Sequence, residues 1–383
     1  MIKLSNCYNT AQFRRLAKAR LPGPVFHYID GAADDEVTYR RNTDAFETCD
    51  LVPNVLSGVE KVDLSTEIMG VNMDMPLFLS PTALQRLFHH DGERAVCRAA
   101  HQNNVLFGIS SLATVSIEEI GRMNNALKMF QLYYHKDKAL TWGMIERCKE
   151  AGFDALALTV DTIVGGNRER DLWTGFTSPP KLTGRSLASF AVHPSWTLNY
   201  ILRGSFELPN LKEYIPEGSN VSISVSDYFS TMLDQSMDWH AAMEIRNRWD
   251  KAFCLKGIMS VEDARRAVQI GADAIMVSNH GGRQLDGSRA PFDQLAEIVD
   301  AVGSDIDVIC DGGIHRGTHI LKALSVGAKA CSGGRWYLYA LAGGGQPGVE
   351  RAIANLKSEI ERDMKLMGMK SISELSRSNL RYR

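Results

Sequence analysis

Three stretches of the sequence share one pattern, and this pattern decides the expected fold: GFDALALTVD at 152–161, GADAIMVSNH at 271–280 and GAKACSGGRW at 327–336. Each begins with glycine, continues as an apolar run typical of a β-strand and ends in polar residues. Repetition of one such unit indicates an α/β fold built from repeated supersecondary structure. By itself the pattern fits both a closed barrel and an open, doubly wound sheet.

Similar apolar runs recur along the whole chain. We expect eight strands, at 75–80, 105–109, 128–133, 154–160, 252–256, 273–278, 306–310 and 328–333. Helix-like stretches with apolar residues at i, i+3 and i+4 lie between most of them, at 91–102, 137–150, 261–270 and 316–326. Eight strand–helix units favour an α/β fold of the (β/α)8 TIM barrel type, because eight strands suit closure and no dinucleotide-binding glycine motif follows the first strand. The segment GGGQPG at 343–348 formally matches that motif, but it follows the last strand, and we expect it to begin a helix.

Two regions fall outside the repeat. Residues 1–70 precede the first strand and are expected to form an N-terminal helical extension, in which LPGPVFHYIDGA (21–32) marks a turn before a short helix. Residues 165–225 form a long insertion after strand 4, and a loop of this length in a compact domain is usually functional. We expect residues 1–383 to be a single domain, with the barrel over 71–370.

Composition limits the class of protein. Hydrophobic residues make up 44% and charged residues 23%, as in soluble globular proteins, and the net charge of -2 disfavours a nucleic-acid partner. The seven cysteines are scattered without a CxxC pair, which argues against a disulfide framework and for a reducing compartment. The N-terminus is mixed and charged, and no stretch has 18 consecutive apolar residues. We therefore expect a cytoplasmic protein.

Almost every expected strand ends in a polar or charged residue. In a barrel of this kind the active site lies at the carboxyl ends of the strands, and a buried core would not favour such residues. We therefore expect a pocket with several convergent polar groups. The candidates are Thr82, Ser110, Gln131, Tyr133, Thr159, Asp161, Lys256, Ser278, His280, Asp311, Gly334 and Arg335.

Glycine-rich turns follow the last two expected strands, DGGIHRG at 311–317 and SGGRW at 332–336. The loops after these two strands are the usual phosphate site of the fold, because glycine lets backbone N–H groups approach an anion. The sequence therefore predicts a phosphate-bearing ligand.

The segment SNHGGRQLD at 278–286 combines His280 with Arg283. Histidine can take a proton near neutral pH, and arginine holds a carboxylate through its planar fork. Together they predict deprotonation of an anionic substrate, and Asp161 could orient and stabilise the charged imidazole. Arg168 and Arg170 follow Asp161 on the insertion, and for Arg170 we expect only a solvated loop face.

We expect no metal site. His315 and His319 are four residues apart but lack the glutamate of a metalloprotease motif. His89 and His90 have no partner ligands near them in the sequence.

With these residues in view, the chain resembles the FMN-dependent 2-hydroxy acid dehydrogenase and oxidase family, which includes glycolate oxidase, L-lactate dehydrogenase and mandelate dehydrogenase. The resemblance covers nearly the whole chain, and its most specific motifs are SPTAL (80–84), FQLYYHKD (130–137), LTVDT (158–162), LKGI (255–258), SNHGGRQLD and DGGIHRG. It implies oxidation of a lactate- or mandelate-like L-2-hydroxy acid to the 2-keto acid, with FMN as the cofactor.

Carried over residue by residue, the resemblance implies that His280 is the base on the substrate hydroxyl, supported by Asp161. Arg168, Arg283 and Tyr28 are implied to hold the substrate carboxylate, and Tyr133 to contact the hydroxyl. Flavin contacts are implied for Thr82, Ala83, Ser110, Gln131, Thr159, Lys256 and Ser278, with Lys256 near the ring position that becomes anionic on reduction. Contacts to the ribityl and phosphate groups are implied for Asp311, Gly313, Gly334 and Arg335.

Two positions bear on cofactor affinity and substrate size. The family usually has Arg where this chain has His315, so one contact to the FMN phosphate is expected to be lost, with Arg316 or a protonated His315 as substitute. Leu112 occupies a pocket position that is Trp in plant glycolate oxidases, so a side chain larger than that of glycolate should fit.

The insertion around 185–211 resembles that of bacterial membrane-associated mandelate and lactate dehydrogenases. A membrane surface suits its composition, although its aromatic residues could equally pack on the barrel or at a subunit contact. The residues concerned are Phe190, Trp196, Tyr200 and Ile201 with Arg185 and Arg203. The resemblance implies a quinone or oxygen as electron acceptor, peripheral contact with the inner face of the cell membrane, and a homotetramer.

Other interpretations stay open. A phosphate-binding barrel isomerase or lyase would use the same glycine turns without flavin, and it predicts a colourless protein. A non-catalytic flavin-binding scaffold predicts bound FMN that no hydroxy acid bleaches. Within the family, a larger or peptide-derived substrate is the further alternative.

Overall fold

The computed structural model describes residues 3–123, 126–174, 189, 191–202, 207–212 and 231–383. These residues contain a closed barrel of eight parallel strands, which confirms the predicted (β/α)8 fold. The barrel strands are β4 (Leu77–Thr82), β5 (Phe107–Ser110), β6 (Lys128–Leu132), β7 (Ala155–Thr159), β8 (Ala252–Ile258), β9 (Ala274–Val277), β10 (Asp307–Asp311) and β11 (Ala330–Gly333). β11 pairs with β4 and closes the ring, and each predicted strand overlaps one of these eight.

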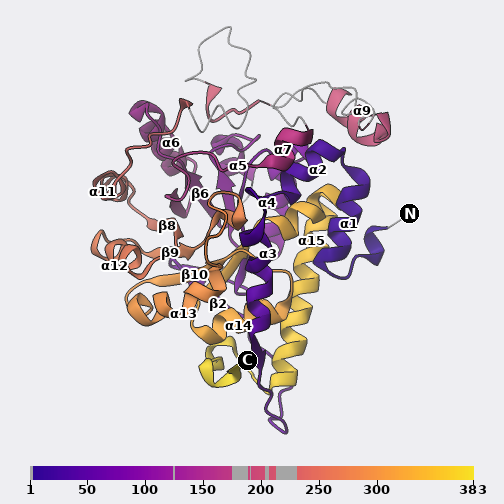
Figure 1. Cartoon of the computed structure of the whole chain (residues 1–383), viewed down its shortest axis with the longest axis vertical. Coiled ribbons are helices and arrows are strands. Elements are labelled where there is room, and N and C mark those ends of the chain that lie inside the picture. Colours follow the sequence, from indigo (N-terminus) through magenta and orange to yellow (C-terminus); the bar gives the residue numbers. More distant parts are fainter. Residues whose placement is uncertain (1–2, 124–125, 175–188, 190, 203–206, 213–230) are drawn as a thin grey trace.

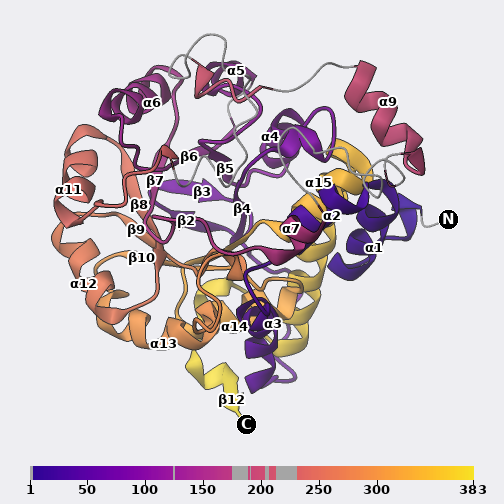
Figure 2. The same cartoon turned by 45° about the horizontal axis from the view of Figure 1, so that its top comes forward.

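Helices surround the barrel (Figure 2). The four helices predicted between strands correspond to α4 (Glu93–Gln102), α6 (Lys138–Glu150), α12 (Val261–Gln269) and α14 (Gly317–Val326). Between other strands lie α5 (Ile117–Met123), α11 (Trp239–Arg248) and α13 (Pro291–Val302). Polar caps fix where several of them begin: the Asp137 carboxylate accepts a hydrogen bond from the Ala139 N–H at α6, and the Ser260 hydroxyl accepts one from the Asp263 N–H at α12.

The amino-terminal end of the barrel is closed by a hairpin of β2 (Thr66–Ile68) and β3 (Val71–Met73). Ile68 and Met73 are buried in one apolar cluster with Met129 and other residues of the barrel strands. Side chains therefore fill this end of the barrel, and the polar residues at the opposite, carboxyl ends of the strands are left to form a site.

The N-terminal extension contains α1 (Thr10–Arg20), α2 (Gly23–Asp30) and α3 (Val37–Asp44), but it is not wholly helical as predicted. It also contains β2 of the hairpin and β1 (Cys49–Leu51), which pairs with β12 (Leu380–Tyr382) at the other end of the chain. The prediction of a turn over 21–32 was wrong, because α2 occupies most of that stretch. Pro24 lies in the first turn of α2, where a helix needs no N–H from it.

The helix that follows the last barrel strand, α15 (Arg335–Met367), packs against α1 (Figure 1). It bends at Gly345, whose φ of 61° and ψ of -145° are not helical, and Pro347 lies just beyond the bend. The segment 343–348 therefore starts a second helical stretch, as predicted, and is not a dinucleotide-binding turn.

Two helices of the insertion are described, α7 (Glu169–Thr174) and α9 (Pro194–Leu202). On α9, the rings of Trp196 and Tyr200 stack at 5.0 Å between centroids and pack against the apolar core, and the Trp196 indole N–H donates to the Leu87 carbonyl. These two aromatics therefore face the protein. Of the other residues predicted to meet a membrane, Arg185, Phe190, Arg203 and the side chain of Ile201 lie outside the described residues. None of the described helices has the length and apolar character needed to cross a bilayer.

Candidate active site

A cavity lies at the carboxyl ends of the barrel strands, where the sequence predicted a site. Most of the predicted residues line it: Tyr28, Thr82, Ala83, Ser110, Leu112, Gln131, Tyr133, Thr159, Arg168, Lys256, His280, Arg283, Asp311, Gly313, Gly334 and Arg335. Asp161 and Ser278 are not part of the lining, but each contacts a residue that is. The cavity therefore brings together residues from every barrel strand except β9, and Ser278, which directly follows β9, contacts the lining residue Lys256.

His280 and Asp161 form a hydrogen-bonded pair at the cavity wall. The His280 Nδ1 lies 3.0 Å from the Asp161 Oδ1, and the Thr162 hydroxyl lies 2.9 Å from that oxygen and 3.1 Å from Nδ1. His280 has a φ of 57°, a left-handed conformation that is rare for residues other than glycine, and Gly281 follows with a φ of 66°. Strain of this kind is characteristic of functional sites, and His280 lines the cavity.

The electrostatics of this pair suit a base. Burial lowers the pKa of His280 below its usual value, an effect that Asp161 opposes. Burial raises the pKa of Asp161, but His280 and Lys256 outweigh it and hold that pKa below the usual range. Near neutral pH the imidazole is therefore neutral and the carboxylate ionised. The carboxylate then accepts the Nδ1–H bond, and this tautomer leaves Nε2 as the proton acceptor.

Two arginines flank the ring of Tyr28. The Cζ atoms of Arg283 and Arg168 lie 4.9 Å and 5.5 Å from the ring centroid. Nη1 of Arg283 donates to the carbonyls of Tyr28 (2.7 Å) and Gly31 (3.0 Å), which fixes its position. Burial and the neighbouring Arg168 lower the pKa of Arg283 to about 10, so it is still a cation at neutral pH. Two cations and a phenol at one place suit a carboxylate.

Lys256 belongs to a buried polar network across the inside of the barrel. Its Nζ lies 3.3 Å from the Asp311 Oδ2 and donates to the Ser278 hydroxyl at 3.2 Å. The hydroxyls of Ser278 and Ser332 each donate to Asp311 at 2.7 Å. Burial opposes the charge on Lys256, but Asp311 and Asp161 outweigh it and raise the pKa of the lysine. The network therefore holds a fixed cation at the cavity wall.

Unpartnered polar atoms test whether the cavity fits a flavin. The Gln131 Nε2 and the Thr159 hydroxyl are buried without a hydrogen-bond partner among the described residues, and both residues line the cavity. The Ser110 hydroxyl donates to the Gln131 Oε1 at 3.0 Å, which fixes the amide with Nε2 as its remaining donor. Buried polar groups normally have partners, so these atoms call for a polar ligand. A flavin ring, with its carbonyl and imide groups, fits them.

The end of the cavity where the sequence predicted a phosphate differs from the expectation. His315 lines it, but burial, with the nearby His319 and Arg335, lowers the pKa of His315 to about 4, so it is neutral at pH 7. Arg316 is not in the lining and pairs with Glu359 at 2.8 Å instead. Neither His315 nor Arg316, the two expected substitutes for the arginine of the family, therefore brings a positive charge to this end of the cavity.

Arg335 lines the cavity, but its guanidinium is engaged. It donates to the carbonyls of Ile29 (3.0 Å), Gly281 (2.8 Å) and Gly31 (2.8 Å). Its charge lies beside the glycine turns, while the bonds to Ile29 and Gly31 hold the N-terminal extension onto the barrel and the bond to Gly281 fixes the loop after β9.

The prediction for Arg170 was wrong. Its guanidinium pairs with the buried Asp30 at 2.9 Å and also with Glu36. Asp30 accepts further hydrogen bonds from Arg14 and from the Tyr339 hydroxyl. Arg170 therefore ties α7 to the N-terminal extension and is not a solvated loop residue.

Among the residues at the site that the sequence reasoning missed are Thr162 and Gly257. Thr162 bridges the His280–Asp161 pair. Gly257 has a φ of 113°, and a Cβ there would lie 2.6 Å from both Cβ and Cγ of Asp161, so only glycine leaves room for that carboxylate. Both lie inside motifs that the sequence had already singled out, LTVDT and LKGI.

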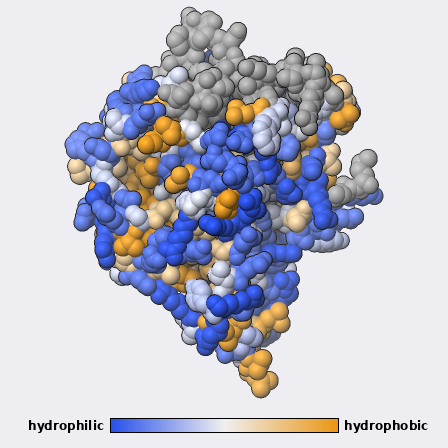
Figure 3. Space-filling view, viewed as in Figure 1, coloured by the Kyte–Doolittle hydropathy of each residue, from blue (hydrophilic) through white to orange (hydrophobic). Residues whose placement is uncertain are grey.

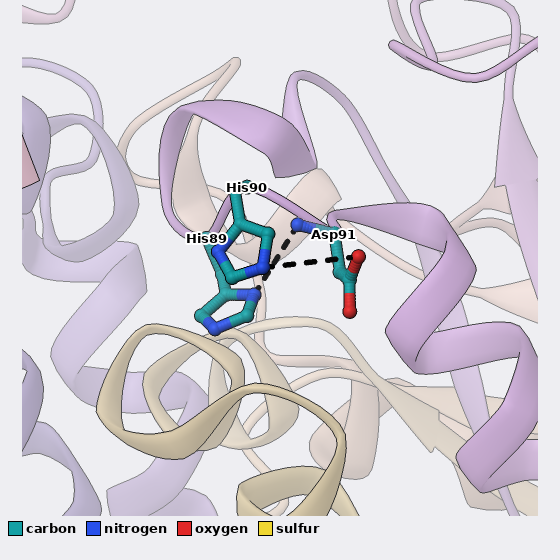
Figure 4. Close-up of side chains that lie close together, drawn as sticks. All are labelled: His89, His90 and Asp91. Carbon is teal, nitrogen blue, oxygen red and sulfur yellow. Dashed lines mark hydrogen bonds and ion pairs between the residues drawn. The ribbon is translucent and has the colours of Figure 1, made fainter. Parts of the chain in front are cut away.

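A second group of polar side chains lies outside the cavity, at His89, His90 and Asp91 (Figure 4). Their ligand-type atoms lie within 4.8 Å of one another. The His89 Nδ1 accepts the Asp91 N–H, and the Asp91 carboxylate pairs with Arg98 at 2.9 Å. These interactions compete with a metal ion for the His89 Nδ1 and the Asp91 carboxylate, and the absence of a metal here stays a prediction.

Comparison with known proteins agrees with this geometry. A family model described as FMN-dependent dehydrogenase matches residues 17–382. An L-lactate dehydrogenase of Vibrio cholerae is 39% identical over 97% of this chain and 98% of its own, and an L-lactate oxidase of Nostoc is 38% identical over 99% of this chain and 100% of its own. A crystal structure described as monotopic membrane protein (S)-mandelate dehydrogenase superposes with a TM-score of 0.94 at 34% identity, covering 99% of this chain and 100% of that one. The chain therefore belongs to the FMN-dependent α-hydroxy acid dehydrogenase and oxidase family.

Proposed function

We propose that this protein oxidises an L-2-hydroxy acid of the lactate or mandelate type to the corresponding 2-keto acid. The observation that carries the proposal is the meeting, in one cavity, of a neutral imidazole backed by a carboxylate and two arginines around a tyrosine. A 2-hydroxy acid carries the two groups that these elements recognise, a carboxylate and an adjacent hydroxyl. Membership of an FMN-dependent family also argues against the alternative of a flavin-free isomerase or lyase.

The residues act in a definite order. Arg168 and Arg283 bind the substrate carboxylate, and Tyr133 contacts the hydroxyl, which orients the substrate and lowers the entropy lost on reaction. His280 Nε2 takes the hydroxyl proton as the C–O bond becomes C=O, and Asp161 stabilises the imidazolium that forms.

FMN, when bound, accepts the two electrons and the hydrogen that leave the α-carbon. Gln131 and Thr159 would hold its ring, and Lys256 would supply a cation that favours a reduced, negatively charged ring. We propose that Asp311 holds Lys256 in place and does not itself contact the cofactor. Its two carboxylate oxygens already accept hydrogen bonds from Ser278 and Ser332.

The apolar part of the cavity wall limits the size of the substrate side chain that fits. Leu112 is buried and lines the cavity. An aliphatic side chain at this place leaves more room than an indole, so we propose a substrate larger than glycolate. A peptide-derived substrate is the further candidate within the same chemistry.

The direct test is the visible absorption spectrum of the purified protein, recorded without oxygen before and after addition of L-lactate and, separately, (S)-mandelate. We expect a flavin spectrum that bleaches with at least one of them, and no bleaching with the D-enantiomer. A flavin that neither acid bleaches would contradict the proposed substrate class and favour a non-catalytic scaffold or the larger substrate.

We also propose that the protein works as a homotetramer in the cytoplasm, peripheral on the inner face of the membrane, with a quinone or oxygen as acceptor. Apolar side chains support the membrane contact: Leu172 and Trp173 on α7 are 70% and 73% exposed, and Leu198 and Leu202 on α9 are 55% and 77% exposed. Both helices lie at the end of the molecule drawn at the top of Figure 1, and Figure 3 shows hydrophobic residues at that end. The structural relative is described as a monotopic membrane protein.

Flotation with anionic lipid vesicles tests the membrane contact. We expect the wild type to float with the vesicles and a Trp173→Ser, Leu202→Ser double variant to stay in solution. A wild type that never floats would contradict it. Oxygen uptake compared with reduction of a quinone analogue identifies the acceptor, and analytical ultracentrifugation gives the oligomeric state.

A further inference from the structure

The phosphate end of the cavity has an unexplained hydrogen-bond donor, the indole of Trp336. This residue follows Arg335 in the first turn of α15, its side chain is only 2% exposed, and it lines the cavity. Among the described residues, nothing accepts a hydrogen bond from its Nε1. A buried N–H without an acceptor destabilises a protein, so such a group needs a partner.

The Trp336 N–H is one of a small group of unpartnered polar atoms in the cavity lining that the structure describes. Only three of the buried side-chain atoms found without a partner in the described residues belong to the cavity lining: Gln131 Nε2, Thr159 Oγ1 and Trp336 Nε1. The first two were predicted from the sequence to contact the flavin. Trp336 was not predicted to do so, but its Nε1 is likewise a buried polar atom of the cavity lining without a partner in the described part of the chain.

The position of Trp336 identifies which part of the cofactor it meets. A Cβ placed on Gly333 would lie 3.0 Å from the Trp336 Cδ1, 3.2 Å from its Nε1 and 3.9 Å from the Ile314 Cβ. The N–H edge of the indole therefore lies where the two glycine-rich turns approach each other. These turns, together with the N-terminus of α15, are the expected place of the phosphate.

The surrounding charges explain why another donor matters here. The nearby His315 is neutral, and Arg316 forms an ion pair with Glu359. Arg335 donates three hydrogen bonds to backbone carbonyls. A phosphate at this end therefore meets fewer side-chain donors than the sequence led us to expect.

We propose that the Trp336 indole N–H donates a hydrogen bond to the phosphate of FMN and takes over part of the role of the arginine that His315 replaces. The proposal rests on FMN as the cofactor and not on the identity of the hydroxy acid. It assigns to Trp336 a contribution to FMN affinity that is specific for the phosphate group.

The test compares two flavins that differ only in that phosphate. The full-length apoprotein is titrated with FMN and with riboflavin, and binding is followed by quenching of flavin fluorescence. A hydrogen bond to a charged group is worth about a ten- to a hundredfold change in affinity, so Trp336→Phe should weaken FMN binding by about that factor and change riboflavin binding less than about twofold. Trp336→His, which keeps a ring N–H, should recover part of the loss.

Trp249→Phe is the matched control. Trp249 is also buried, but its indole N–H donates to the Ala252 carbonyl at 2.8 Å, away from the cavity. Its loss should lower stability and leave the preference for FMN over riboflavin unchanged. Equal weakening of both flavins in Trp336→Phe would overturn the proposal, and so would unchanged FMN affinity.

A measurement on the wild type covers the case in which Trp336→Phe does not fold. The chain has six tryptophans, whose indole N–H groups give separate signals in a protein carrying ¹⁵N-labelled tryptophan. One signal should move downfield in the FMN complex relative to the riboflavin complex. Six signals that are the same in both complexes would overturn the proposal independently of any variant.

Discussion

Replacing Asp161 by Asn removes the charge that the reaction needs behind His280. In the wild type the Asp161 Oδ1 lies 3.0 Å from the His280 Nδ1. At an effective dielectric constant of about 20, unit charges at that distance attract by roughly 5–6 kcal/mol, and this attraction exists only after the imidazole has taken the substrate proton. Asn keeps an acceptor for the Nδ1–H, so we expect about half of this, ~3 kcal/mol, to be lost from the transition state.

A loss of that size slows reduction of the flavin about a hundredfold. The assay is stopped-flow absorbance of the FMN-loaded protein mixed anaerobically with the hydroxy acid that bleaches the wild type. The matched control is Thr162→Val, which removes the hydroxyl that contacts both Asp161 and His280 but removes no charge. We expect a smaller loss there than in Asp161→Asn, because the hydroxyl's hydrogen bond to the ionised Asp161, worth about 1.5–3 kcal/mol, is present before as well as after proton transfer.

The pH profile separates this electrostatic role from a structural one. His280 must be neutral to accept a proton, so the reduction rate falls as the pH falls through its pKa. Burial lowers that pKa and Asp161 raises it, so Asp161→Asn should lower the pKa further and move the acid limb to lower pH. A reduction rate within about threefold of the wild type, or an acid limb that moves to higher pH, would refute the reasoning.

Three further changes test other parts of the site and its support. Arg283→Lys loses the planar fork and should raise KM and lower kcat by at least about tenfold together, and unchanged steady-state kinetics would remove Arg283 from the site. Gly257→Ala places a Cβ 2.6 Å from Asp161, so it should slow flavin reduction and lower the unfolding free energy by about 1–3 kcal/mol, and normal values of both in stopped-flow and urea unfolding would show that the close approach is unimportant. Arg170→Met leaves the buried Asp30 with fewer partners and should lower the unfolding free energy by about 1–3 kcal/mol in urea titrations, whereas a variant as stable as the wild type would make the pairing of α7 with the N-terminal extension irrelevant to stability.

The site could be largely predicted because of the way a parallel barrel is built. Short buried runs such as β7 and β9 are visible in the sequence as apolar stretches, and each is followed by polar residues such as Asp161 and His280. All strands of the barrel run in one direction, so residues that follow them in the sequence meet at one end in space. The positions of the strand ends therefore predicted much of the cavity lining without any knowledge of distances, while Tyr28 and Arg168 were implied by the resemblance to the family.

Local patterns were less informative where a residue's partner is remote. Arg170 looked like a loop residue, but its partner Asp30 lies 140 positions earlier, and only the packing of α7 against α2 brings them together. In the same way, α2 was mistaken for a turn because Pro and Gly were read as breakers, although Pro24 is compatible with the first turn of a helix.

The sequence by itself determined the order of strands and helices, the end of the barrel that carries the chemistry, and the residue types available there. Only the tertiary structure decided the state of those residues. Burial makes His315 neutral, carbonyls of the N-terminal extension occupy Arg335, and the indole N–H of Trp336 is left without an acceptor. The physical reason is that charge state and hydrogen bonding depend on desolvation and on distances to groups hundreds of residues away, and neither is encoded in the neighbouring sequence.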